Sequence, residues 1–271
     1  MAASPGAARL TGTDLTLAYD QRVVATGLGV AIPDESFTVI IGPNACGKST
    51  LLRALARMLK PRKGAVHLDG SVITSLPSKE VARRLGLLPQ SSIVPDGISV
   101  ADLVARGRYP HQRLMRQWSK ADEAAVAEAM RATDVAELAD RIVDELSGGQ
   151  RQRVWLAMAL AQETPILLLD EPTTFLDISH QIEVLDLCAD LHEAGRTMVA
   201  VLHDLNQACR YATHLIVMRA GEVVAEGVPA EIVTPELVLR VFDLRCEIIQ
   251  DPQTGTPMIV PEARRRVSAP A

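Results

Sequence analysis

Residues 42–49 read GPNACGKS and match the pattern GxxxxGK[ST]. A short apolar, β-branched run at 37–41 precedes them and predicts a buried strand. The segment from Ser49 to Leu59 predicts a helix that Lys60-Pro61 would end. In this strand–turn–helix context the pattern predicts a phosphate-binding turn. A chance glycine turn before a core helix is the alternative, and the correct order of all three elements argues against it.

The residue types of this turn suit a nucleoside triphosphate with Mg²⁺. Gly42 and Gly47 allow the backbone to curl so that successive N–H groups face the phosphates, and the helix start adds its positive dipole end. We expect Lys48 to reach the β- and γ-phosphates and the Ser49 hydroxyl to bind Mg²⁺. We also assign to this phosphate site the other residues of the turn and the residue that follows Ser49. These are Pro43, Asn44, Ala45, Cys46 and Thr50.

Two acids follow a second apolar run, at 166–169. We expect Asp170 to accept Mg²⁺, directly or through water. We expect Glu171 to polarise the water that attacks the γ-phosphate, which is the work of a general base. Two solvated acids at a strand end are the alternative, and the phosphate turn upstream makes that alternative the weaker one.

The rest of the chain predicts an α/β fold. Polar and apolar residues alternate over 14–19 and 23–32, which indicates paired antiparallel strands near the N-terminus. Alanine- and glutamate-rich segments between Ser78 and Glu145 predict a helical insert. Further along, strands alternate with helices, so the core sheet should be mainly parallel with helices on both faces. The segments concerned are the helices at 147–162 and 178–194, the strand at 197–202 and a strand pair at 215–224.

This organisation predicts one nucleotide-binding domain over residues 10–245, with a helical subdomain at about 90–160 inside it. Residues 246–271 would form a C-terminal tail with a turn at 251–255. From about Ala263 onward the residues are basic and small, so we expect that end of the tail to be loose.

Composition argues against several classes of protein and of binding site. A chain of 271 residues with 48% hydrophobic residues can bury a core without disulfides, and a net charge of −5 argues against wrapping nucleic acid. The four cysteines show no CxxC spacing, so neither a zinc site nor a disulfide framework is indicated and a reducing compartment fits. The longest uncharged stretch, Ser36 to Gly47, has 12 residues, well short of the roughly 18 that span a bilayer. Any role at a membrane would therefore need a partner protein.

A third motif, LSGGQR at 146–151, stands directly before the predicted helix at 147–162. Ser147 is placed to cap that helix, and Gly148 and Gly149 leave backbone N–H groups unobstructed, which makes a second anion cradle. A flexible linker is the alternative, but the apolar run VWLAMALA follows at once. The hexapeptide resembles the signature of ABC-type ATPases, and the resemblance extends over roughly residues 11–261.

The resemblance implies an ATPase that works as a homodimer. In that family the signature of one subunit caps ATP held on the phosphate loop of its twin, so Ser147, Gly148, Gly149 and Gln150 would serve the partner's ATP. The positive end of a helix dipole contributes about 0.3–1 kcal/mol at an exposed site. Closure of the dimer would therefore depend on ATP, and hydrolysis would let it reopen.

Four further residues match the family pattern, each with an ordinary alternative. Tyr19 resembles the aromatic that stacks on adenine, but it could be a plain strand tyrosine. Gln90 resembles the glutamine that senses Mg²⁺ and the attacking water, but it could be a solvated loop residue. Asp177 resembles the aspartate that communicates across the dimer, but it could simply cap a helix. His203 resembles the histidine that contacts the γ-phosphate, but it could be structural.

Positions 45 and 46 depart from the family pattern, which often has glycine at the first and alanine or serine at the second. Because alanine tolerates positive φ poorly, we expect Ala45 to adopt a conformation that suits a Cβ. Cys46 would lie beside a phosphate cradle and a helix N-terminus, so we expect a lowered thiol pKa. Thiol reagents should then inactivate the protein, and ATP should protect it.

Within the family, the resemblance points to the detachable ATPase subunit of an importer. No spanning segment is evident, the interval between Gln90 and Leu146 is too short for coiled-coil arms, and one cassette is present. The amino-acid sequences of three segments are similar to those of iron-siderophore importers, a group that overlaps with haem and cobalamin importers. These segments are 104–112, 173–181 and 249–252.

That placement implies partners and a location. The partners would be membrane permease subunits and, indirectly, an extracytoplasmic substrate-binding protein, with no nucleic acid. The chain would sit peripherally on the cytoplasmic face of the inner membrane. Arg106, Arg108 and Tyr109 would either line a groove for the permease or form a solvated helix face. A permease-free ATPase acting in assembly or repair remains an alternative, as does a small-molecule kinase, which would not need the second cradle.

Overall fold

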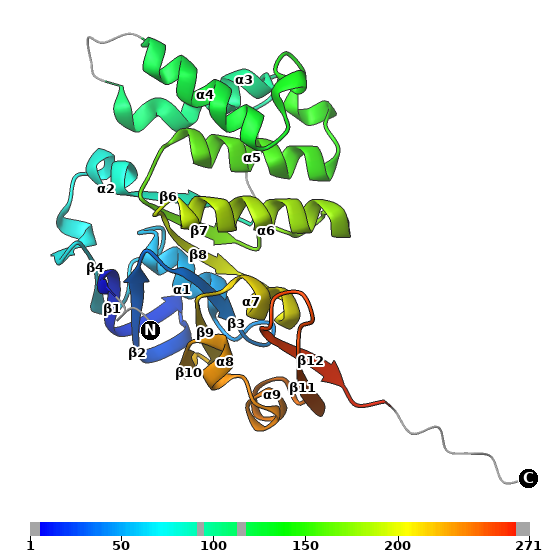
Figure 1. Ribbon diagram of the computed structural model, residues 1–271. Coiled ribbons are helices and arrows are strands. Elements are labelled where there is room, and N and C mark those ends of the chain that lie inside the picture. Colours follow the sequence, from blue (N-terminus) through cyan, green and yellow to red (C-terminus); the bar gives the residue numbers. More distant parts are fainter. Residues whose placement is uncertain (1–5, 91–94, 113–117, 264–271) are drawn as a thin grey trace, which may run out of the picture.

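A six-stranded sheet forms the centre of the molecule, in the strand order β10-β9-β3-β8-β7-β6 (Figure 1). The computed structural model describes residues 6–90, 95–112 and 118–263. All neighbours in the sheet are parallel except β9 and β10, which confirms the predicted, mainly parallel core. The strands are β3 (Phe37–Ile41), β6 (Leu85–Leu88), β7 (Ile166–Asp170), β8 (Thr197–Val201), β9 (His214–Arg219) and β10 (Glu222–Gly227).

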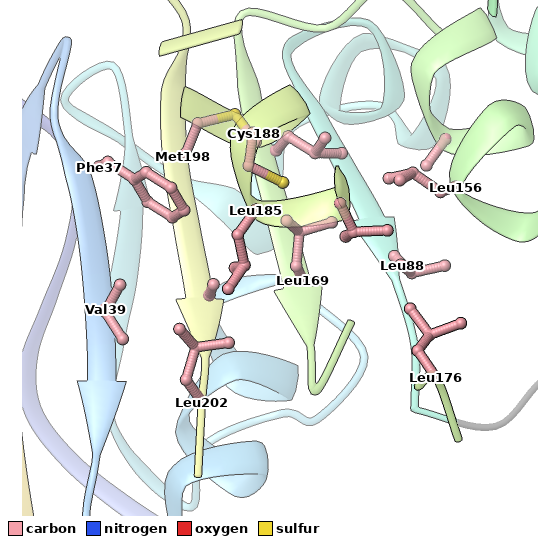
Figure 2. Packing of buried hydrophobic residues seen from close by; sticks show 14 of the residues in the cluster. Phe37, Val39, Leu88, Leu156, Leu169, Leu176, Leu185, Cys188, Met198 and Leu202 are labelled. Carbon is pink, nitrogen blue, oxygen red and sulfur yellow. The ribbon is translucent and has the colours of Figure 1, made fainter. Parts of the chain in front are cut away.

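Both faces of this sheet are buried, because side chains alternate between two hydrophobic clusters. On β3, Phe37 and Val39 pack on one face and Ile40 packs on the other. Figure 2 shows the first cluster, in which Leu169, Met198 and Leu202 of the sheet region meet Leu185 and Cys188. Leu185 and Cys188 belong to helix α6 (Ile178–Glu193), which covers this face.

The N-terminal strands form a separate antiparallel sheet, as predicted. Its order is β2-β1-β4-β5. Its apolar side chains join the second cluster together with helix α1, which therefore lies between the two sheets. The strands are β1 (Gly6–Tyr19), β2 (Arg22–Asp34), β4 (Lys63–Leu68) and β5 (Ser71–Val72).

Helix α1 (Lys48–Leu55) is shorter than predicted. The sequence indicated a helix to Leu59, but Arg57 has φ +62°, and the N–H groups of Met58 and Leu59 both bond back to the carbonyl of Arg53. This left-handed turn closes the helix by satisfying its last carbonyls. The prediction was wrong because arginine, rather than the usual glycine, takes the left-handed position.

The helical insert is present, with one strand that the sequence analysis missed. Residues 85–88 lie in the region expected to be helical, yet they form β6, which pairs with β7 and extends the core sheet. The segment at 135–139 contains only a 3₁₀ turn, Ala136–Leu138. The helices of this region are α2 (Ser78–Arg84), α3 (Val100–Ala105), α4 (Lys120–Ala132) and α5 (Gly148–Ala161), with 3₁₀ turns at Ile73–Ser75, Arg106–His111 and Val143–Glu145.

Arg108 corrects another expectation, since it is neither solvated nor free to line a groove. Its guanidinium is buried and donates to Asp122, to Glu163 and to the carbonyl of Ala161, at 2.9, 2.5 and 2.7 Å. Hydrogen bonds from Ser119, and then the Arg108 pair, lower the pKa of Asp122 to about 2, against the effect of burial. Arg108 therefore ties α4 to the end of α5, whereas Tyr109 is exposed beneath the ammonium of Lys79.

The chain ends with short helices and a hairpin. Residues 246–261, part of the expected tail, form two paired antiparallel strands that lie against α7 (Figure 1). The expectation of a loose terminus concerns residues 264–271, which lie outside the described part. In the described ranges, no helix is long and apolar enough to cross a bilayer. The elements are α7 (Leu205–Tyr211), α8 (Pro229–Ile232), α9 (Pro235–Phe242), β11 (Cys246–Gln250) and β12 (Pro257–Pro261).

Candidate active site

The phosphate turn leaves the carboxyl end of β3 and enters α1, and its shape depends on glycine. Gly42 has φ +155°, and a Cβ there would lie 2.2 Å from the carbonyl oxygen of Met218. Gly47 has φ +108° and precedes the first residue of α1. Lys48 is buried and donates from Nζ to the carbonyls of Gly42 and Pro43, at 2.8 and 3.0 Å. The Lys48 side chain therefore lies across the opening of the phosphate turn, where a phosphate would approach.

A cavity of about 250 Å³ opens over this turn. It brings together nine residues assigned to the site from the sequence, although they come from four separate segments. Arg22 and Val24, which the sequence analysis did not single out, complete the lining with Tyr19, Asn44, Ala45, Gly47, Lys48, Ser49, Thr50, Glu171 and His203. Tyr19 stands at the end of β1 with its ring half-exposed and its hydroxyl 3.3 Å from Arg53.

Asp170 has the environment of a cation ligand. Its side chain is 1% exposed, and neither carboxylate oxygen has a hydrogen-bond partner in the described part of the chain. Burial raises the pKa of this carboxyl, while the neighbouring Ser49 hydroxyl and the charges of Arg53 and Lys48 oppose that change. A buried carboxylate without partners is costly unless a cation compensates it. The residues present therefore fit a divalent metal ion bound between Asp170 and Ser49.

Glu171 is held at both carboxylate oxygens. Nε2 of Gln90 donates to Oε2 at 2.7 Å, and Nε2 of His203 lies 2.7 Å from Oε1. Thr174 adds a hydroxyl donor at 3.2 Å. Gln90 follows β6, Glu171 follows β7 and His203 follows β8, so three neighbouring parallel strands deliver these groups to one edge of the sheet. The glutamate is thus held at the lining of the cavity by groups from three strands.

Arg53 is the main residue of the site that the sequence analysis missed. Its Nε lies 3.8 Å from Asp170, and its Nη1 donates to Tyr19. The signal was present in the sequence, because Arg53 comes four residues after Ser49 on the same helix and therefore shares its face.

The second predicted anion cradle, at Ser147, is formed, but it lies away from the cavity over the phosphate turn. Ser147 caps α5, since its Oγ accepts from the N–H of Gln150 at 3.2 Å and Gln150 Oε1 accepts from the N–H of Ser147 at 3.1 Å. This reciprocal pair is a capping box. A cavity of about 440 Å³ faces it, lined by Ser147, Gly148, Gly149, Gln150, Arg153, Phe175, Leu176, Asp177 and His180. This cavity and the one over the phosphate turn have no lining residue in common.

Asp177 lies in this second group and caps helix α6. Its Oδ1 accepts from the N–H of His180, from Ser179 and from the ring of His180, at 3.1, 3.0 and 2.6 Å. Hydrogen bonds, first that of the His180 N–H, lower the pKa of its carboxyl. Within one chain, Asp177 therefore has the role that the sequence analysis gave as its alternative, and it does not reach the phosphate turn.

Ala45 does not avoid positive φ as predicted, because it has φ +61°. A left-handed non-glycine residue costs about 1–3 kcal/mol. We expect Ala45→Gly to change the free energy of unfolding by less than about 1 kcal/mol, since relief of this strain is offset by the entropy that glycine loses on folding. Ala45→Val should lower it by at least about 1 kcal/mol, because a β-branched residue resists this conformation. Chemical denaturation of both variants measures the difference, and equal stability would contradict the assigned turn.

The expectation for Cys46 was wrong in direction. Its side chain is buried, a Cβ on Gly42 would lie 2.8 Å from its Sγ, and desolvation raises the thiol pKa although Lys48 opposes the change. All four cysteines are free and buried. We therefore expect the folded protein to resist a maleimide that labels all four thiols once urea unfolds it, as intact mass would show. Fast labelling of Cys46 alone in the folded protein would contradict this burial.

Comparisons with known proteins place the chain in a family. The ABC transporter family model matches residues 25–174. The ferric enterobactin transport ATP-binding protein FepC of Escherichia coli (strain K12) is 61% identical over 258 residues, which cover 95% of each chain.

Two solved structures are also similar. One is described as an ABC transporter of the metal-chelate type in an inward-facing conformation; it has a TM-score of 0.79 and 28% identity and covers 96% of this chain and 98% of that one. The other is a dimeric bacterial ABC transporter cassette, with a TM-score of 0.73, 26% identity and coverage of 81% and 98%. With a family model matching more than half of its length and a relative so similar throughout, the chain belongs to the ABC transporter family, as an ATP-binding cassette that hydrolyses ATP.

Proposed function

We propose that this chain is the ATPase subunit that powers uptake of ferric siderophores through a partner permease. The observation that carries the proposal is the 61% identity to a ferric enterobactin transport ATP-binding protein over 95% of both chains. The chain would work peripherally on the cytoplasmic face of the inner membrane, with an extracytoplasmic binding protein delivering the chelate to the permease. The chelate would never touch this subunit, so its own residues do not select among siderophores.

We also propose that two copies of the chain enclose ATP between them, head to tail. The support lies in the separation of the two cradles, because the cavity at Ser147 and the cavity at Lys48 share no lining residue. Beside the Ser147 cavity, Phe175 and Ile178 are 81% and 78% exposed. Adjacent exposed apolar side chains are typical of a surface that a partner covers. A second copy would cover them while bringing its own phosphate turn to Ser147.

Each residue of the site would then have its own role in binding or hydrolysing ATP. Tyr19 would stack on the adenine, and Lys48 would leave the carbonyls of Gly42 and Pro43 to meet the phosphates. Glu171 would take the proton of the attacking water. Gln90 and His203, already bonded to Glu171, would hold that water and the γ-phosphate in register.

Mg²⁺ would be held by Ser49 and Asp170, with Gln90 near it. The ion would neutralise charge that develops on the phosphates during transfer to water. Asp170 could serve as its ligand without breaking a hydrogen bond, since its oxygens have no hydrogen-bond partner in the described part of the chain and form an ion pair there only with Arg53. The partner's Ser147, Gly148, Gly149 and Gln150 would close the opposite side of the γ-phosphate, and its Asp177 would lie at the same interface.

Growth on a defined iron source tests the transport role. Cells lacking the gene for this chain should fail to grow when a ferric catecholate siderophore is the sole iron source. The intact chain should restore growth, and a Glu171→Gln chain made in equal amount should not. Siderophore-dependent growth that persists without the chain, together with loss of haem or cobalamin use, would overturn the assigned substrate. A chain that purifies without any membrane permease would favour a role in assembly or repair.

A further inference from the structure

The short helix α7 links the candidate active site to the C-terminal hairpin. His203 stands directly before Asp204, which caps α7 by accepting from the N–H of Gln207 at 2.7 Å. The helix has only 7 residues, too few to hold its own geometry without tertiary contacts. His203 lies between the end of β8 and the start of α7, so the contacts that hold α7 contribute to the direction in which His203 is presented to Glu171.

One face of α7 is bonded to the hairpin. Asn206 forms two hydrogen bonds with the backbone of Ile259 in β12. Its Oδ1 accepts from the Ile259 N–H at 2.7 Å, and its Nδ2 donates to the Ile259 carbonyl at 3.3 Å. One turn later, Arg210 donates to Oδ2 of Asp251 from Nε and Nη2, at 3.1 and 2.6 Å. Asp251 is itself buried in the hairpin turn, where its carbonyl accepts from the N–H of Gly255 and its Oδ1 from that of Gln253.

The other polar face of α7 is bonded to α6. Gln207 donates to Gln181 at 3.1 Å, and the Tyr211 hydroxyl donates to Asp186 at 2.6 Å. The inner face, with Ala208 and Cys209, is buried in the core. The hairpin thus completes a three-sided support for α7.

We propose that the hairpin β11–β12 acts as a brace that sets the position of His203, with Asn206 and Arg210 as positioning residues for ATP hydrolysis. This inference rests on the role proposed for His203 above. It requires that loss of the brace affects the chemical step more than ATP binding, because most residues assigned to the phosphates lie on the turn at 42–49 and not on α7.

Kinetics of matched variants test the brace. Asn206→Ala and Arg210→Ala should lower kcat about tenfold, since small misplacement of a catalytic group has effects of this order or more, while ATP affinity stays within about twofold. Asn206→Asp keeps the acceptor for the Ile259 N–H but turns its second oxygen toward the Ile259 carbonyl in place of a donor, so it should recover only part of the lost kcat. Glu247→Ala, at an exposed position of β11 and without a side-chain bond to α7 among the described residues, is the control and should keep the kcat of the parent. An unchanged kcat in both alanine variants would overturn the proposal.

A second readout separates positioning from general destabilisation. If Asn206 acts through His203, adding Asn206→Ala to His203→Ala should lower kcat no further; an equal loss in both backgrounds would overturn the proposal. The ¹³C–¹H resonance of the His203 ring, identified by its absence in His203→Ala, should shift in Asn206→Ala and not in Glu247→Ala. A resonance that does not move also counts against the brace. A normal kcat in His203→Ala would instead refute the proposed role of His203, and the resonance alone would then decide the brace.

Discussion

Glu171→Gln is expected to abolish ATP turnover while preserving ATP binding. The amide has the shape of the carboxylate and can still meet Gln90 and Thr174, but it cannot accept a proton from water. Loss of a general base lowers kcat by about 10²–10⁴-fold. Because the clamp around ATP remains, the variant should accumulate as an ATP-bound dimer, measured by light scattering after gel filtration with Mg-ATP.

The control for this variant is Glu193→Gln, which removes an equal charge from the exposed last residue of α6. It should hydrolyse ATP at the rate of the parent and remain unable to accumulate as an ATP-bound dimer. A Glu171→Gln protein that hydrolyses ATP within about twofold of the parent would remove Glu171 from its role as the base.

The second large effect is expected from Gly148→Asp. A Cβ at Gly148 meets only the Cβ of Phe175, at 3.8 Å, so there is room for a side chain. A carboxylate in the first turn of α5 favours the helix itself, by about 0.3–1 kcal/mol, so stability should not fall. The same charge would repel the phosphates of the partner's ATP. We expect kcat to fall at least about a hundredfold, as when a preorganised anion donor is lost.

The affinity of the single chain for ATP should not change in Gly148→Asp, because the residue is absent from the cavity over the phosphate turn. Gly148→Ala is the matched control, since it adds the Cβ without the charge and should keep most activity. Fluorescent-nucleotide titration and phosphate release measure the two quantities. Equal losses of activity in both variants would show that space, not charge, matters at this position.

The chemistry of the site was predictable because it lies in short motifs whose residue types are dictated by phosphates. The phosphate turn, the Asp170-Glu171 pair and the capped Ser147 turn are local features, and each forms where the sequence placed it. The meeting of Gln90, Glu171 and His203 was not predictable from periodicity. It depends on β6, β7 and β8 being neighbours, and strand order is a property of the whole sheet.

The predictions that were wrong also failed because of contacts between segments distant in sequence. β6 has four residues, LGLL, too few for a period of two to be distinguished from a helical one. Cys46 was expected to be reactive because it lies beside a phosphate cradle and a helix N-terminus, but the turn folds its thiol inward against Gly42. Arg108 looked like a surface charge, yet partners from α4 and beyond the end of α5 surround it. Each outcome is decided by segments distant in sequence.

Cross-linking between two distinguishable copies tests most directly whether ATP is held between them. One tagged Glu171→Gln chain carries Asn44→Cys and an untagged one carries Gly148→Cys; Asn44 is exposed in the cavity over the phosphate turn, and the native thiols are buried. With Mg-ATP, a short bifunctional maleimide should join one chain of each kind, and omission of the nucleotide should prevent it. A chain carrying both cysteines that cross-links only within itself, or no product despite labelled thiols, would contradict an ATP site shared by two copies.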